Sequence, residues 1–227
     1  MIYIKNISKT FNGTEVLKDV SFTVTDNAIT SIIGPNGIGK TTIFNIICGI
    51  LMPDQGMIES DLNTHNIFTV LSGNQNLYAK NTVEENIFYL SILRGISSTK
   101  IRENIEKYYK YFPIYHSIKN KLFEELSFGQ KQLATIFAAL VTDSKYLLFD
   151  EPTEGLDLEN KKQLQSVLSS ISKFKTILLT SHDPYFISVI SDQLIFLKNA
   201  KVASISKSLS SEQFIENYEK IYGGSAL

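Results

Sequence analysis

The chain has no tryptophan and contains only one cysteine, five prolines and three histidines among its 227 residues. Its lone Cys48 excludes a disulfide within the chain, which fits a reducing compartment. The charges nearly balance: the chain has 22 Lys and Arg residues and 23 Asp and Glu residues, for a formal net charge of −1. The composition therefore gives no strong electrostatic attraction to nucleic acid or to an anionic membrane surface.

Long apolar runs are missing as well. The longest run, 133–141, is interrupted by Thr135 and is far shorter than the roughly 20 residues that a membrane-spanning helix needs. The first five residues lack the charged and apolar regions of a signal peptide. We therefore expect a soluble intracellular protein, which another chain would have to bring to a membrane.

Strand patterns alternate with helix patterns along most of the chain. Apolar residues alternate with polar ones from Val20 to Val24, and the β-branched run 29–33 ends at Gly34. Further strands are expected at 67–71, 146–149 and 176–180, and helices at 41–51, 158–172 and after Ser210. This alternation predicts an α/β fold with a largely parallel sheet, into which a helical stretch over 82–140 is inserted.

One segment matches the phosphate-loop pattern G-x-x-x-x-G-K-[ST] between an expected strand and an expected helix. It reads Gly34-Pro35-Asn36-Gly37-Ile38-Gly39-Lys40-Thr41-Thr42. Its glycines let successive N–H groups point into one concavity at a helix N-terminus. Lys40 supplies positive charge for the β and γ phosphates, and the Thr41 hydroxyl can bind Mg²⁺. A glycine-rich turn matches by chance in roughly one such chain in 100, so the segment predicts a nucleoside triphosphate site.

Two carboxylates follow the apolar strand 146–149. In a parallel sheet the ligand crevice lies at the carboxyl ends of the strands, so Asp150 is expected beside the phosphate loop, where it can hold hydrated Mg²⁺. Glu151 can then accept a proton from the water that attacks the γ-phosphate. Without the phosphate loop, solvated loop carboxylates would be the better interpretation.

Two further segments have a structural interpretation beside a functional one. Ser127 and Gln130 form a capping box for the helix that follows, but the same geometry aims a hydroxyl and the Gly129 N–H outward as a second anion site. His182 follows the strand 176–180. A histidine in that place is usually structural, and only the other motifs favour a functional role.

In their order along the chain, these motifs resemble the nucleotide-binding subunit of an ATP-binding cassette (ABC) transporter, of the short single-cassette bacterial type. The signature-like segment 126–132, then Glu151 to Asp157, then His182, are specific to that family. The resemblance implies an ATPase with a P-loop NTPase core, an N-terminal antiparallel β subdomain and an inserted helical subdomain. It implies one domain over 1–227, with 1–81 and 141–227 as core and 82–140 as the insertion.

The resemblance also implies roles within one chain. Phe11 would stack on adenine, and residues 34–42 would wrap the phosphates of ATP. Asp150 would position Mg²⁺ together with Thr41. Glu151 would polarise the attacking water, and His182 would contact the γ-phosphate.

Other roles would be shared between chains. Two cassettes of the family pack head to tail, so Ser127, Gly129 and Gln130 would close over ATP bound to a second cassette, either a copy of this chain or a related one. The insertion would offer a groove to a separate polytopic membrane subunit, with the protein cytoplasmic and peripheral on the inner face of the cell membrane. The short segment after His182 resembles exporters more than importers. No nucleic acid partner is expected, although the segment 107–112 mixes basic and aromatic residues.

The chain departs from the family pattern at three places. Phe128 stands where the signature usually has glycine, and Asn27-Ala28 replaces a Gly-Glu turn, which asparagine tolerates. The third departure affects coupling to the membrane subunit. Gly73 occupies the place of a glutamine that senses Mg²⁺ and the membrane subunit in relatives, and Gln75 is a candidate replacement.

Two other function classes compete with transport. A non-transport cassette ATPase would act on ribosomes, DNA or cluster assembly; many such proteins carry paired cassettes, coiled-coil arms or basic tails, and none is seen here. A small-molecule P-loop kinase would need an acceptor-binding region in place of 127–130. The motifs favour the transport ATPase.

Overall fold

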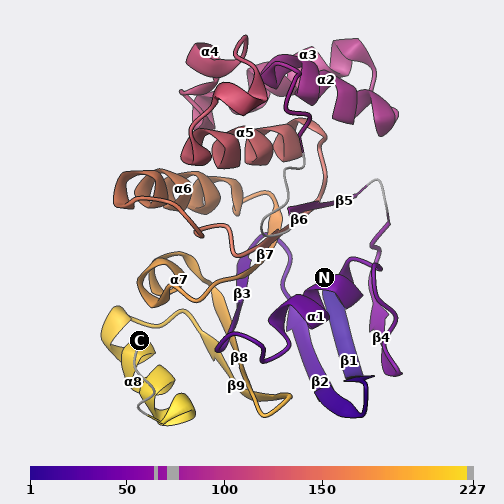
Figure 1. Ribbon diagram of the computed structural model, residues 1–227, viewed down its shortest axis with the longest axis vertical. Coiled ribbons are helices and arrows are strands. Elements are labelled where there is room, and N and C mark those ends of the chain that lie inside the picture. Colours follow the sequence, from indigo (N-terminus) through magenta and orange to yellow (C-terminus); the bar gives the residue numbers. More distant parts are fainter. Residues whose placement is uncertain (64–65, 71–76, 224–227) are drawn as a thin grey trace.

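The computed structural model describes residues 1–63, 66–70 and 77–223 (Figure 1). Within these residues a six-stranded sheet has the order β5-β6-β7-β3-β8-β9, and a three-stranded antiparallel sheet has the order β2-β1-β4. The larger sheet contains β3 (Ile29–Ile33), β5 (Ile67–Val70), β6 (Tyr146–Asp150), β7 (Thr176–Thr180), β8 (Gln193–Lys198) and β9 (Lys201–Lys207). The smaller sheet contains β1 (Ile2–Phe11), β2 (Thr14–Val24) and β4 (Gln55–Glu59). All neighbours in the larger sheet pair in parallel except β9, which pairs antiparallel with β8.

Helices cover both faces of the larger sheet, and a helical block stands at one end of it (Figure 1). The helices are α1 (Lys40–Ile47), α2 (Val83–Leu93), α3 (Ser98–Tyr108), α4 (Tyr115–Ile118), α5 (Phe128–Val141), α6 (Leu158–Ile171), α7 (Pro184–Ile190) and α8 (Ser211–Tyr222), with 3₁₀ turns η1 (Tyr109–Tyr111) and η2 (Phe123–Glu125). No helix of the described residues combines the length and the apolar character that crossing a membrane requires.

Strand β6 lies between the two main hydrophobic clusters, one on each face of the larger sheet. All of its residues are buried, and successive side chains enter opposite cores. Tyr146 and Leu148 join a cluster with α1 and the smaller sheet, whereas Leu147 and Phe149 join a cluster with the helices of the other face. A strand buried on both faces reads as a continuous apolar run, and this run ends at Asp150.

The expected α/β fold with a largely parallel sheet is confirmed, as is the capping box of Ser127 and Gln130 that begins α5. A capping box of Thr82 and Glu85 begins α2 in the same way. The expected end of the first helix was wrong. That helix stops at Ile47 and not at residue 51, because the chain turns at Cys48 and Gly49 has a φ of 72°.

The last helix, α8, packs one face against the rest of the protein. Phe214 is buried, and Tyr218 and Tyr222 pack against the same cluster. Ile215, by contrast, is 41% exposed. The sequence patterns did not predict β4, α7, β8 or β9.

Candidate active site

The carboxyl ends of three neighbouring parallel strands bring the expected site residues together. Strand β3 leads into the phosphate loop, β6 ends at Asp150, and β7 ends at Thr180, directly opposite Asp150 in the ladder. Because parallel strands end at the same edge of a sheet, residues more than 100 positions apart in sequence become neighbours there.

The phosphate loop encloses a cavity of about 210 Å³ at this edge. It is lined by Asn36, Gly37, Gly39, Lys40, Thr41, Thr42, Asp150 and Glu151. Gly37 and Gly39 have φ values of 79° and 107°, which side-chain-bearing residues rarely adopt. The Lys40 side chain is only 6% exposed, and its ammonium donates to the carbonyl oxygens of Gly34, at 2.7 Å, and Pro35, at 3.3 Å. The loop thus holds a buried positive charge at the N-terminus of α1, where an anion is stabilised.

Asp150 is oriented by two hydroxyl groups. Thr41 Oγ1 donates to its Oδ2 at 3.1 Å, and Thr180 Oγ1 donates to its Oδ1. The residues present fit Mg²⁺, which commonly takes one or two carboxylates and completes its shell with water and substrate phosphates. A protein cage of three or more acidic, His or Cys side chains is not found among the described residues, and this ion does not require one.

Glu151 lies between the side chains of His182 and Lys40. Its Oε2 is 2.9 Å from His182 Nδ1 and accepts from the His182 backbone N–H at 3.1 Å, and its Oε1 is 3.6 Å from Lys40 Nζ. Its backbone has a φ of 51°, and its N–H donates to Thr180 Oγ1 at 2.9 Å. A left-handed non-glycine residue costs about 1–2 kcal/mol, and such conformations cluster at functional sites.

The signature-like segment and Phe11 do not line this cavity within the chain. Ser127 Oγ accepts from the Gln130 N–H at 3.3 Å, and Gln130 Oε1 accepts from the Ser127 N–H at 3.2 Å, so both serve as caps of α5. Gly129 is buried against Asn160, whose side chain would lie 2.4 Å from an added Cβ. Phe11 is 42% exposed at the end of β1, with the Lys9 ammonium 5.6 Å from its ring centre.

A family model described as ABC transporter matches residues 17–154, which is more than half of the chain. This chain belongs to the ABC transporter family. The matched residues include the phosphate loop, the signature-like segment and the Asp150–Glu151 pair. The protein is therefore an ATP-binding cassette and an ATPase.

Curated relatives match almost the whole cassette. The tungstate uptake system ATP-binding protein TupC of Peptoclostridium acidaminophilum is 31% identical, over 88% of this chain and 96% of the relative. The ABC transporter ATP-binding protein NatA of Bacillus subtilis is 30% identical, over 89% of this chain and 87% of the relative. The energy-coupling factor transporter ATP-binding protein EcfA3 of Oenococcus oeni is 29% identical, over 100% of this chain and 86% of the relative.

Solved structures share the fold. CbiO1 of Clostridium perfringens, part of the transporter complex CbiONQ, superposes with a TM-score of 0.84 at 25% identity, covering 97% of this chain and 92% of its own. The ADP conformation of the cassette MJ1267 gives 0.83 at 25% identity, with 99% of each chain covered. A dimeric post-hydrolysis state of the cassette MJ0796, bound to ADP and Pi, gives a TM-score of 0.78 at 25% identity, covering 92% of this chain and 100% of its own.

The sequence patterns did not predict a role at the site for two residues that contact it. Thr180 orients Asp150 from a neighbouring strand. Tyr222 of α8 donates to the carbonyl oxygens of Ile33, directly before the phosphate loop, and of Leu197 on β8. Neither belongs to a local motif, so only the fold reveals them. Gly73 and Gln75, the expected and the replacement positions of the missing glutamine, lie outside the described residues.

Asp183, directly after His182, fixes the start of α7 and yields a stability prediction. Its Oδ1 accepts from the Phe186 N–H at 3.0 Å, and its Oδ2 pairs with Lys161 Nζ at 2.6 Å. Burial alone would raise the pKa of Asp183, but the bonds from Lys161 and from the Phe186 N–H prevail and lower the pKa below its ordinary value. The carboxylate therefore stabilises the fold above the unfolded-state pKa of about 3.9.

We expect Asp183→Ala to lower the free energy of unfolding by about 1–2 kcal/mol at pH 7, because both the cap and the ion pair are lost. Asp183→Asn keeps the cap and should cost less. As the pH falls through the native pKa of Asp183, the stability difference between wild type and Asp183→Asn should shrink. Urea unfolding of the three proteins at pH 7 and below pH 4 measures this; a difference between wild type and Asp183→Asn that stays constant with pH would contradict it.

Proposed function

We propose that ATP hydrolysis at this edge of the sheet drives a substrate across a membrane through a separate polytopic subunit. The observation that carries the proposal is the convergence of Lys40, Asp150 and Glu151 on one cavity in a chain of the ABC transporter family. On this proposal the cassette works on the inner face of the cell membrane. It comprises one domain in which residues 82–140 are an insertion.

The chemistry assigned to each side chain follows from its contacts. Bound Mg²⁺, held by Thr41 and Asp150, would neutralise phosphate charge. Lys40 lies close enough to the cavity for its ammonium to bind a phosphate in place of the carbonyl oxygens of Gly34 and Pro35. Glu151 would accept the proton of the attacking water, and His182, already bonded to Glu151, would hold that carboxylate in place.

A second cassette would complete the site. In one chain Ser127, Gly129 and Gln130 stay outside the phosphate-loop cavity, and the Ser127 side chain lies exposed at the N-terminus of α5. An exposed helix N-terminus with a hydroxyl suits the γ-phosphate of ATP bound by a partner. We propose a dimer of two copies of this chain, with a pair of related cassettes as the alternative. The adenine would stack on Phe11, whose ring is 42% exposed.

The contact with the membrane subunit is proposed at an apolar surface on and beside α2, the α2 apolar patch. It consists of Tyr78, Tyr89, Ile92 and Leu93, which are between 40% and 65% exposed. Tyr78 and Tyr89 meet edge to face with ring centres 5.0 Å apart. Clustered exposed apolar side chains mark protein–protein contacts, and the relatives EcfA3 and TupC are named as ATP-binding proteins of transport systems.

We expect Leu93→Asp to leave the ATPase rate of the isolated cassette within about twofold of wild type, since surface substitutions rarely change stability much. The same change should abolish co-purification of a polytopic subunit from solubilised host membranes. Ile205→Asp, which places the same charge on an exposed apolar position of β9, serves as the control and should retain the subunit.

A Leu93→Asp protein that keeps the subunit would contradict the proposed contact. Recovery of the wild-type cassette with ribosomes instead of a membrane subunit would favour the non-transport alternative.

The direction of transport is a separate question. Export is the expected direction, whereas TupC and the petrobactin protein YclP of Bacillus subtilis are named for uptake and import. Substrate flux in vesicles containing both subunits tests the direction.

A further inference from the structure

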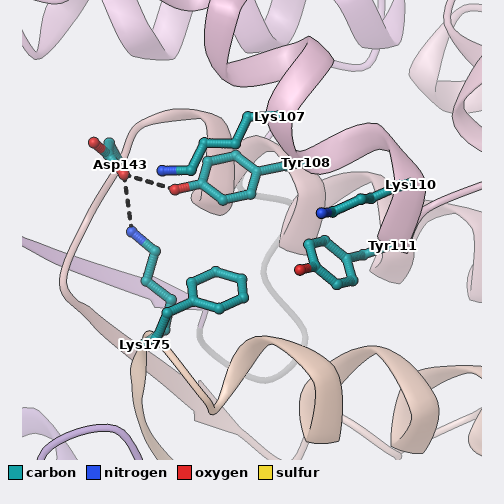
Figure 2. A pocket seen from close by; sticks show the side chains of 7 residues that line it. Lys107, Tyr108, Lys110, Tyr111, Asp143 and Lys175 are labelled. Carbon is teal, nitrogen blue, oxygen red and sulfur yellow. Dashed lines mark hydrogen bonds and ion pairs between the residues drawn. The ribbon is translucent and has the colours of Figure 1, made fainter.

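A second cavity, of about 280 Å³, lies between η1 and the loops that precede β6 and β7 (Figure 2). We call it the lysine–tyrosine pocket. Its lining is Lys107, Tyr108, Lys110, Tyr111, Asp143, Phe174 and Lys175. The labelled side chains surround one hollow, with Lys107 and Tyr108 across from Lys175 (Figure 2). None of these residues takes part in the ATPase site described above.

The pocket is at the opposite edge of the sheet from the phosphate loop. Lys175 directly precedes β7, and Asp143 lies three residues before β6. Both strands run from there towards the catalytic edge, where β7 ends at Thr180. Five strand residues at about 3.3 Å each span about 16 Å. A ligand in this pocket would therefore be distinct from ATP in the phosphate loop.

The charges of the pocket favour an anion. Lys175 is only 5% exposed; its Nζ lies 3.0 Å from Asp143 Oδ1, which also accepts from the Tyr108 hydroxyl at 2.8 Å. The carboxylate of Asp143 is thus already satisfied from within the protein. Lys107 and Lys110 place their ammonium groups 4.7 and 5.1 Å from the ring centres of Tyr108 and Tyr111, and neither forms an ion pair with a described residue. Three ammonium groups against one carboxylate leave the lining net positive.

Aromatic rings form the other part of the wall. Phe174 stacks with Tyr108 at 6.0 Å and lies 5.7 Å from Tyr111. Tyr111 and Phe174 are half-buried, so part of each ring faces the hollow. Such faces pack well against another planar ring. The volume is near the lower end of the range for small-molecule pockets, which limits the ligand to a small one.

We propose that the lysine–tyrosine pocket binds a small organic anion with a planar ring, a ring-bearing phosphate or carboxylate. Lys107 and Lys110 bind the charged group, because both residues are exposed and neither forms an ion pair within the described part of the chain. Tyr111 and Phe174 contact the ring. The bound molecule bridges the helical block, through η1, to the loop at the start of β7.

Phenyl phosphate and benzoate serve as probes, because they carry the ring with a phosphate or a carboxylate. Each is titrated by calorimetry into the full-length protein with Mg²⁺ and saturating ADP, so that the phosphate loop is filled. Inorganic phosphate tests charge without a ring, and benzyl alcohol tests a ring without charge. We expect at least one of the two probes to bind at one site at least tenfold more tightly than either control, about 1.4 kcal/mol. The probe that binds more tightly identifies the anionic group.

The double variant Lys107→Ala/Lys110→Ala should weaken that binding at least tenfold. Lys201→Ala/Lys207→Ala removes the same charge from exposed positions of β9 and should bind as the wild type does. Tyr111→Leu removes the ring face and provides an independent test if the double variant does not fold. Absence of saturable binding in the millimolar range, equal binding of inorganic phosphate, or binding unchanged in the folded pocket variants would overturn the proposal. The ATPase assignment does not depend on this result.

Discussion

Glu151→Gln should reduce ATP hydrolysis by about 10²–10⁴-fold, the usual contribution of a general base, while ATP affinity stays near that of the wild type. Glutamine cannot accept the proton of the attacking water. It can still hydrogen-bond to His182, which contacts Glu151 at 2.9 Å, so the site should keep its shape. A slower reaction with intact binding should trap the ATP-bound dimer.

Two measurements test this expectation. Steady-state phosphate release gives the rate, and sizing in the presence of Mg·ATP, Mg·ADP or no nucleotide gives the association state. We expect a dimer of Glu151→Gln only with Mg·ATP. Glu159→Gln, a change of the same type at an exposed position in the first turn of α6, should behave as the wild type. A Glu151→Gln protein that remains monomeric at saturating ATP would contradict the shared site.

Gly39→Ala should abolish tight nucleotide binding and lower the melting temperature by roughly 4–8 °C. Gly39 has a φ of 107°, and a Cβ there would lie 2.9 Å from Leu17 Cδ2 and 3.0 Å from the Val16 carbonyl oxygen. Because the carbonyl belongs to the backbone, relief requires a shift of the phosphate loop itself. That shift would displace the N–H groups that are expected to bind phosphate.

Gly37→Ala is the matched control, in the same loop. Gly37 also has a positive φ, 79°, but an added Cβ would have open space within 4 Å. We therefore expect a conformational cost without a clash, and a clearly smaller loss of ADP affinity and of melting temperature. Equal losses in the two variants, measured by calorimetry and thermal unfolding, would show that the contact with Val16 and Leu17 is not decisive.

The elements that sequence patterns predicted well are those with local causes. The phosphate loop and the capping box of Ser127 each depend on residues close together in the sequence, and β6 is a short apolar run with a defined end. Residues that orient the site from a distant part of the sequence could not be predicted from local patterns. Thr180 orients Asp150 only because β7 pairs with β6, and that pairing is not encoded within either strand.

The departures from the family pattern fit this structure. Asn27 has a φ of 53°, the left-handed conformation that asparagine tolerates better than most residues. Phe128 is 55% exposed, and its ring covers Gly155, lying 3.2 Å from where a Cβ of that glycine would be. Gly155, with a φ of 72°, leaves the room that the larger signature residue needs.

The measurement that tests the shared site most directly is a mixing experiment with two inactive variants. Lys40→Ala removes the ammonium of the phosphate loop, and Ser127→Arg blocks the exposed N-terminus of α5. In a mixed dimer, the intact loop of the Ser127→Arg chain would face the intact Ser127 of the Lys40→Ala chain. We expect ATPase activity to reappear when the two proteins are mixed. A mixture no more active than either variant alone, under conditions where the wild type hydrolyses ATP, would contradict it.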